Sequence, residues 1–143
     1  MSLFQGEGRE QLRRRYLAAW QKFQRQAPLE PLEAQLAAVI AEHPEYVSWL
    51  ESGDGALLAE FPPEGGRENP FLHMGLHLAV REQVATDRPA GIAAIHGELT
   101  RRLSGAHPAE HRMIEPLAET LWEAQRSGQA PDETAYLERL RRL

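Results

Sequence analysis

The sequence of 143 residues contains no cysteine, and this absence excludes a whole class of chemistry. Disulfide bonds, thiolate catalysis, and zinc or iron–sulfur sites built on cysteine cannot form. Glycine-rich phosphate-binding loops and the Gly-x-Ser-x-Gly turn of serine hydrolases are also missing from the sequence. Enzyme classes that depend on these motifs therefore find no support.

Long apolar segments and an excess of basic charge are missing as well. No stretch approaches the roughly 18 apolar residues that a membrane helix needs. The segment MSLFQGEGREQLRRR lacks the basic and apolar regions of a secretory signal. Lys and Arg number 16 against 21 Asp and Glu, so the net charge is -5, whereas nucleic-acid binders usually present a basic face. We therefore expect a cytoplasmic protein with no nucleic-acid or membrane partner.

What the sequence does contain is helical periodicity along almost its whole length. Hydrophobic residues make up 42% of the chain, which is enough for one core at this size. They recur at spacings of three and four residues, and no segment shows convincing strand alternation. The sequence therefore predicts an all-α fold in which residues 1–143 form a single helical domain.

Proline and glycine separate the expected helices. The helices are expected over residues 9–26, from after Pro31 to about 43, 45–51, 70–86, from Pro89 to about 103, 108–127, and from Pro131 onward. Asn69-Pro70 is a strong start signal, because Asn caps free N–H groups and Pro fits the first helical position. Helix 70–86 is apolar on nearly every side, which is typical of a buried helix. We predict a compact bundle of five to seven helices around this central helix, which packs against the first and the sixth.

Other segments are expected to be irregular or purely structural. Residues 52–68 form the least regular stretch, and a loop of this length is often functional or mobile. Arg13 to Arg15 are consecutive and cannot share one side of a helix, so we expect a solvated face. The tryptophans lie at apolar helical positions and are expected in the core: Trp20, Trp49 and Trp122.

The six histidines are the most informative feature of the sequence. His73 and His77 are four residues apart on the expected central helix, so both rings leave the same side, one turn apart. Leu76 and Val80 share that side, which is therefore expected to be buried. This arrangement predicts two adjacent imidazoles inside the protein.

A second pair with the same spacing lies on the expected sixth helix. His107 and His111 are one turn apart, and Glu115 and Glu119 continue the row toward the polar flank. Two histidines one turn apart can chelate one ion, and imidazole suits zinc, iron, copper or nickel. We predict a transition-metal site, for zinc or iron, in which the four paired histidines are ligands and Glu115 is an additional or substitute ligand.

Two other roles for the paired histidines stay open. Buried imidazoles can donate hydrogen bonds and serve packing alone, or they can act in metal-free acid–base chemistry or pH sensing, since His titrates near neutrality. His96 lies beside Ile95 and Leu99, and we expect it to be a core residue. His43 precedes Pro44 at a helix junction, where we expect capping or hydrogen bonding.

Three segments carry a resemblance to a known family: EHPEY, NPFLHMGLHLAVREQVATDRPAGI and HPAEHRMIEPLAETLWEAQR. They resemble an uncharacterised bacterial family catalogued as a domain of unknown function. The resemblance covers nearly the whole chain, and the second segment is its most specific part. It implies a small stand-alone bacterial protein and implies no activity.

Two functions are compatible with these observations. The first is a metal-binding helical bundle. As an enzyme, such a bundle would most simply use metal-activated water on a small substrate, with Glu115 or Glu119 as proton acceptor. The second is a non-catalytic interaction module with structural histidines, such as a homodimer, using loop 52–68 or the C-terminal helix as its contact surface. The sequence leaves open whether the chain is an enzyme.

Overall fold

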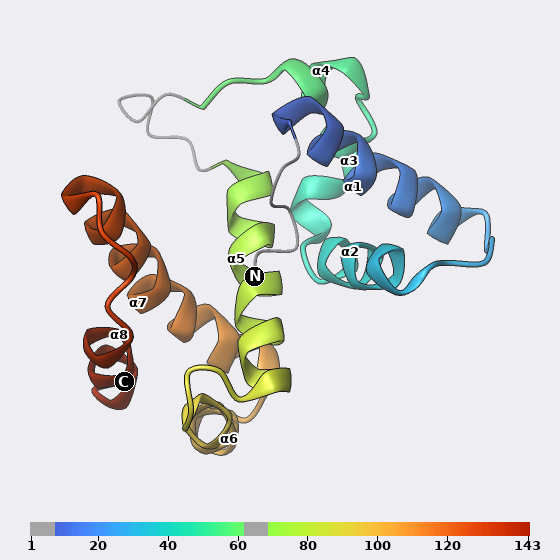
Figure 1. Cartoon of the computed structure of the whole chain (residues 1–143). Helices are drawn as coiled ribbons and strands as arrows, with labels where there is room; N and C mark the ends of the chain where they lie inside the picture. Colours follow the sequence, from blue (N-terminus) through green and yellow to red (C-terminus); the bar gives the residue numbers. More distant parts are fainter. Residues whose placement is uncertain (1–7, 62–68) are drawn as a thin grey trace. The chain divides into compact units, whose positions relative to one another are not determined.

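The computed structural model describes residues 8–61 and 69–143, and within these ranges the chain is helical and contains no strand. The helices are α1 (Arg9–Gln24), α2 (Pro31–Ala41), the 3-10 helix η1 (Pro44–Tyr46), α3 (Val47–Leu50), α4 (Asp54–Leu58), α5 (Pro70–Thr86), α6 (Ile92–Leu103), α7 (Ala106–Ser127) and α8 (Glu133–Arg141) (Figure 1). The all-α prediction is confirmed. The short α4 lies inside the segment expected to be irregular.

The chain divides into two compact units, Met1–Leu78 and Ala79–Leu143, and the boundary lies inside α5. The first unit contains α1 to α4, η1 and the first half of α5. The second unit contains the rest of α5 and α6 to α8. That the whole chain acts as a single domain stays a prediction.

The first unit is built on the hairpin of α1 and α2, closed by the first half of α5 (Figure 1). Its core consists of buried residues from five helices: Tyr16, Ala19, Leu36, Val39, Ile40, Leu50, Ala56, Phe71, Met74 and Leu78. The ring of Tyr16 meets the ring of Phe71 edge-on, with centroids 5.3 Å apart. The predicted packing of helix 70–86 against the first helix is therefore confirmed.

The start of α5 follows from the Asn69-Pro70 signal. The Asn69 side-chain oxygen accepts hydrogen bonds from the main-chain N–H groups of Phe71 (3.0 Å) and Leu72 (3.3 Å). This cap fixes the first turn of the helix and hence the direction in which the later side chains point. Although α5 is apolar on nearly every side, it is not buried on every side. Leu72 is 61% exposed.

Arg13 lies in the core rather than on a solvated face, which corrects one sequence expectation. Its Nη1 donates to the carbonyl oxygens of Ala56 (3.2 Å), Leu57 (3.1 Å) and Ala59 (2.8 Å), at the C-terminal end of α4. Its guanidinium also lies 4.8 Å from the centre of the Phe71 ring. A cation is favourable at a helix C-terminus, where carbonyl groups lack helical partners. Arg13 therefore attaches α1 to α4.

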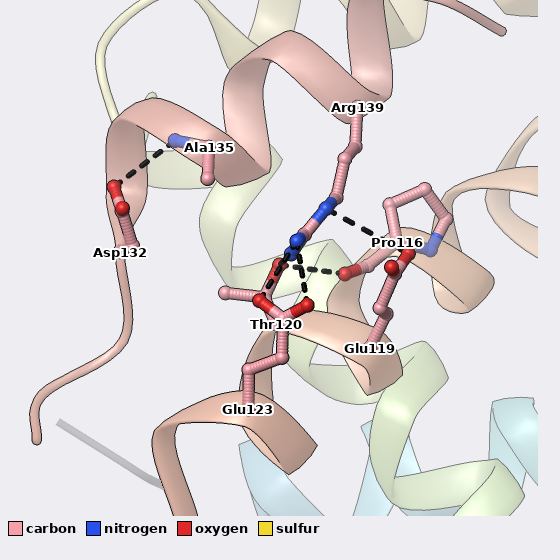
Figure 2. Close-up of polar contacts among 7 residues, drawn as sticks. All are labelled: Pro116, Glu119, Thr120, Glu123, Asp132, Ala135 and Arg139. Atoms are coloured by element: carbon pink, nitrogen blue, oxygen red, sulfur yellow. Dashed lines mark hydrogen bonds and ion pairs between the residues drawn. The ribbon is translucent and has the colours of Figure 1, made fainter. Parts of the chain in front are cut away.

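In the second unit, Arg139 attaches α8 to α7 (Figure 2). Its guanidinium donates to the Thr120 hydroxyl (2.9 Å) and to both carboxylate oxygens of Glu123 (2.8 and 2.7 Å), and it lies 3.7 Å from Glu119. The Thr120 hydroxyl in turn donates to the carbonyl of Pro116 (2.8 Å). The hydrogen bond with Glu123 raises the pKa of Arg139.

The second half of α5 packs against α7 within the second unit. The Nε of Arg81 donates to both carboxylate oxygens of Glu110, at 3.1 and 3.0 Å. Glu110 is buried, so this ion pair holds the two helices together from inside the unit. The predicted contact between helix 70–86 and the sixth expected helix is therefore confirmed.

The tryptophans divide into two groups. Trp20 and Trp49 are half-buried and pack against the core of the first unit. Trp122 is 55% exposed on α7, so its expected core position is wrong. The guanidinium of Arg126 covers its ring at 4.7 Å. None of the helices in the described ranges combines the length and the apolar character needed to cross a membrane.

Candidate metal centre

Three buried histidines lie together in the first unit: His43, His73 and His77, which are 2%, 9% and 0% exposed. Their ring centroids are separated by 4.7 Å between His43 and His77, 4.7 Å between His73 and His77, and 5.1 Å between His43 and His73. Each imidazole therefore touches the other two. We call this group the histidine triad.

The pair on α5 has the geometry of a chelate. The Nε2 atoms of His73 and His77 are 3.1 Å apart and share a hydrogen bond. Two nitrogens bound at 2.0–2.1 Å to one tetrahedral ion are about 3.3 Å apart. The cap at Asn69 and the regular turns of α5 hold both side chains on one side of the helix, one turn apart. The two atoms therefore need to move little to share an ion.

His43 presents a defined nitrogen to this pair. Its Nδ1 lies 2.7 Å from the carbonyl oxygen of Val39. A carbonyl oxygen can only accept, so Nδ1 carries the proton and, in the neutral ring, Nε2 carries the lone pair. Metal-binding histidines commonly use this arrangement, in which a hydrogen bond from one ring nitrogen orients the other toward the ion.

An aromatic residue completes the wall of the triad. The Tyr46 ring, in η1, is stacked on His43 at 5.3 Å with an interplanar angle of 4°, and it meets His73 edge-on at 6.3 Å. Stacking restricts rotation of the His43 ring. The 3-10 turn after Pro44 brings Tyr46 back onto His43, because the Tyr46 N–H donates to the His43 carbonyl at 2.9 Å.

The second predicted pair lies at the start of α7, in the second unit. The rings of His107 and His111 have centroids 4.7 Å apart and are tilted by 50°. His107 is half-buried and His111 is exposed. Glu115 follows one turn later and is also exposed, and Glu119 is close to Arg139. The structure thus brings together the members of each predicted pair, while Glu115 stays on the solvated side of α7.

Glu110 was not singled out in the sequence. It lies between the α7 histidines, and HPAEH has the His-x-x-Glu-His spacing in which some metalloproteases place two ligands and a general base. Here the Glu110 carboxylate is 5% exposed and is bound by Arg81. The ion pair assigns Glu110 to packing rather than to proton transfer from water.

His43 is the member of the triad that sequence reasoning missed as a site residue. Its predicted hydrogen bond is confirmed by the contact with Val39. The distance along the chain between His43 and the α5 pair does not predict that their rings touch. The contact depends on how the helices pack. The nearby Pro44 and Tyr46 are the only local hints. His96 is half-buried on α6.

The donors at this centre are imidazoles, and this restricts the chemistry. Imidazole binds zinc, copper, nickel and iron, whereas magnesium and calcium prefer oxygen. In the first unit, His43, His73 and His77 supply three such imidazoles, and in the second unit His107 and His111 supply two. Such a set makes transition-metal binding chemically reasonable.

The fold and the histidines define an all-α protein with two helical histidine pairs. The family described as "Domain of unknown function (DUF1841)" matches residues 8–142, so the chain belongs to this family. The resemblance inferred from the three sequence segments is therefore confirmed. No curated protein and no solved structure was found to match the chain.

Proposed function

We propose that the protein binds a transition-metal ion through imidazole nitrogens. The ligands that we propose in the first unit are His43, His73 and His77. In the second unit, the predicted α7 pair of His107 and His111 offers two further nitrogens. The observation that carries this proposal is the 3.1 Å separation of the His73 and His77 Nε2 atoms beside the oriented ring of His43.

A purely structural role of these rings is the alternative to metal binding. A structural histidine is usually satisfied by a carbonyl or a carboxylate, as the Nδ1 of His43 is. At Nε2, His77 shares a hydrogen bond with His73, and the three rings are gathered where burial excludes most water. A metal ion binds imidazoles in their neutral forms, so neighbouring rings can serve one ion together.

The ion that we propose is zinc or iron. Both accept imidazole nitrogen, and neither requires a thiolate. We further propose a bacterial, cytoplasmic protein without nucleic-acid or membrane partners. In a catalytic version, an ion bound on α7 would activate a water toward a small substrate, with Glu115, on the same helix as His107 and His111, as a candidate ligand or proton acceptor.

A second candidate function is an interaction module, and the exposed side chains of Leu121 (42%) and Trp122 (55%) favour it. Adjacent exposed apolar residues on a helix can mark a protein contact. In this version the histidines only fill space, and a second copy of the chain covers α7. Of the loop 52–68 expected as a contact surface, residues 62–68 lie outside the described ranges.

Elemental analysis of untagged protein separates these candidates. We expect about one zinc or iron ion per chain after dialysis against metal-free buffer, and loss of this ion to a strong chelator. A His96→Ala variant is the matched control, because His96 is half-buried on α6 and lies outside the proposed ligand set. Protein that is isolated without metal and takes up neither added ion would contradict metal binding and favour the interaction module.

A further inference from the structure

We infer that an ion held by the histidine triad keeps a fourth coordination position and that this position takes a small anion. The inference rests on the proposed function, because it concerns the ion that His43, His73 and His77 would bind. It goes further by naming the class of ligand, a monoanion with an oxygen or nitrogen donor, and by assigning its size limit to Tyr46. Every residue in this argument belongs to the first unit.

The triad is organised around one point before any ion binds. On α5, the Nε2 atoms of His73 and His77 share a hydrogen bond at 3.1 Å, so both already face the same place. The third ring, His43, is held by the Val39 carbonyl and by the stacked ring of Tyr46. An ion would take the place of the shared proton, which moves to the Nδ1 of its own ring. Ligands that are already ordered lose little freedom when they bind.

Three imidazoles do not complete the coordination of the proposed ion. Zinc prefers four ligands, and three protein ligands with one exchangeable position are typical of its catalytic sites. Non-haem iron(II) sites with histidine ligands likewise keep open positions. An ion on the triad therefore has at least one position that the three rings do not fill.

The charge of the site favours an anion at that position. The three imidazoles bind as neutral rings, so they leave the full charge on a divalent ion. The exposed fractions of His43, His73 and His77 are only 2%, 9% and 0%, and Met74 and Leu78, which follow the α5 pair directly in sequence, belong to the apolar core. An uncompensated charge is expensive to bury. A monoanion cancels half of this charge, whereas a neutral ligand cancels none.

Tyr46 limits the size of the anion. Its ring contacts two of the three ligands, since it is stacked on His43 at 5.3 Å with an interplanar angle of 4° and meets His73 edge-on at 6.3 Å. The lone pair of an imidazole nitrogen lies in the plane of the ring, so a ring stacked on His43 lies alongside the direction from His43 to the ion. Azide is narrow enough to bind beside such a wall, whereas benzoate carries a ring of its own. We therefore expect azide to bind and benzoate to be excluded.

Cobalt(II), with azide and benzoate as probes, tests the inference on the full-length chain. Cobalt at no more than one equivalent per chain should give a visible absorption spectrum that azide changes. Benzoate should need a concentration at least about 10-fold higher for a change of the same size. The His96→Gln control should respond like wild type, whereas His73→Gln should lose the response, because it lacks one of the three rings that hold the ion.

Replacing Tyr46 tests the size limit. We expect Tyr46→Ala to bind benzoate about 10-fold more tightly than Tyr46→Phe, because the space left by one ring admits another. Tyr46→Phe is the matched control, since it keeps the ring. Equal affinities in the two variants would overturn the role of Tyr46. Circular dichroism checks the fold, and if Tyr46→Ala unfolds, the comparison of azide with benzoate in wild type decides the size limit.

The outcomes separate this inference from the proposed function. Wild type that binds cobalt without any response to azide would overturn the inference, although the proposed function stands. An azide response that survives unchanged in His73→Gln would place the open position outside the triad and would overturn it as well. If wild type binds no cobalt, zinc or iron, the proposed function itself fails.

Discussion

Replacing His77 with glutamine should weaken metal binding by at least about 100-fold. His77 is buried completely and its ring contacts both other members of the triad, so its loss leaves the proposed site without a central ligand. Loss of an outer partner of a metal ligand already costs 10- to 100-fold in affinity, and loss of the ligand itself should cost more. Glutamine preserves much of the side-chain volume and keeps a polar group in the buried position.

Competition titration with a chromophoric chelator gives the affinity directly. Thermal unfolding gives an independent readout, because an ion at 100 times its Kd stabilises the folded state by about 2.7 kcal/mol. We expect wild type and the His96→Gln control to gain this stabilisation and His77→Gln to lose it. A His77→Gln protein that is folded and binds zinc as tightly as the control would show that the α5 pair is not a ligand.

Replacing Arg13 with methionine should destabilise the first unit by about 3 kcal/mol. Hydrogen bonds from a charged donor contribute about 1.5–3 kcal/mol, and this substitution also leaves three carbonyls near α4 without their donor. Burial lowers the pKa of the Arg13 guanidinium, an effect opposed by the nearby charge of Glu60. Methionine retains the apolar contact of the side-chain stem, so the loss reports mainly the hydrogen bonds.

The adjacent Arg14 provides the control for this prediction. Its side chain is 61% exposed, and it pairs with Glu10, which is 57% exposed. Exposed pairs contribute little to stability, so Arg14→Met should leave the urea midpoint nearly unchanged. Equal midpoints for Arg13→Met and Arg14→Met, measured with unchanged slopes, would contradict the role assigned to Arg13.

The sequence predicted those parts of the fold that depend on local chemistry. The Asn69-Pro70 signal located the start of α5 because capping depends on neighbouring residues only. Periodicity did not identify Arg13 as a core residue, because its partners lie more than 40 positions away along the chain. Periodicity also predicted a core position for Trp122, whereas this residue on α7 is 55% exposed.

The same distinction applies to the candidate site. The contacts within each pair, His73 with His77 and His107 with His111, follow from helical geometry and were predictable. The contact of His43 with the α5 pair depends on how α2, η1 and α5 pack, so it could not be predicted from spacing in the sequence. Whether Glu115 binds the ion stays a prediction.

X-ray absorption spectroscopy of the zinc-loaded protein tests the central claim most directly, since it reports the atoms around the ion. Zinc bound as proposed should show three or four nitrogen ligands at about 2.0–2.1 Å. The outer-shell scattering of imidazole rings should accompany them. A first shell of oxygen atoms without imidazole scattering would contradict the proposal, because it would place the ion on surface carboxylates and leave the buried histidines with a packing role.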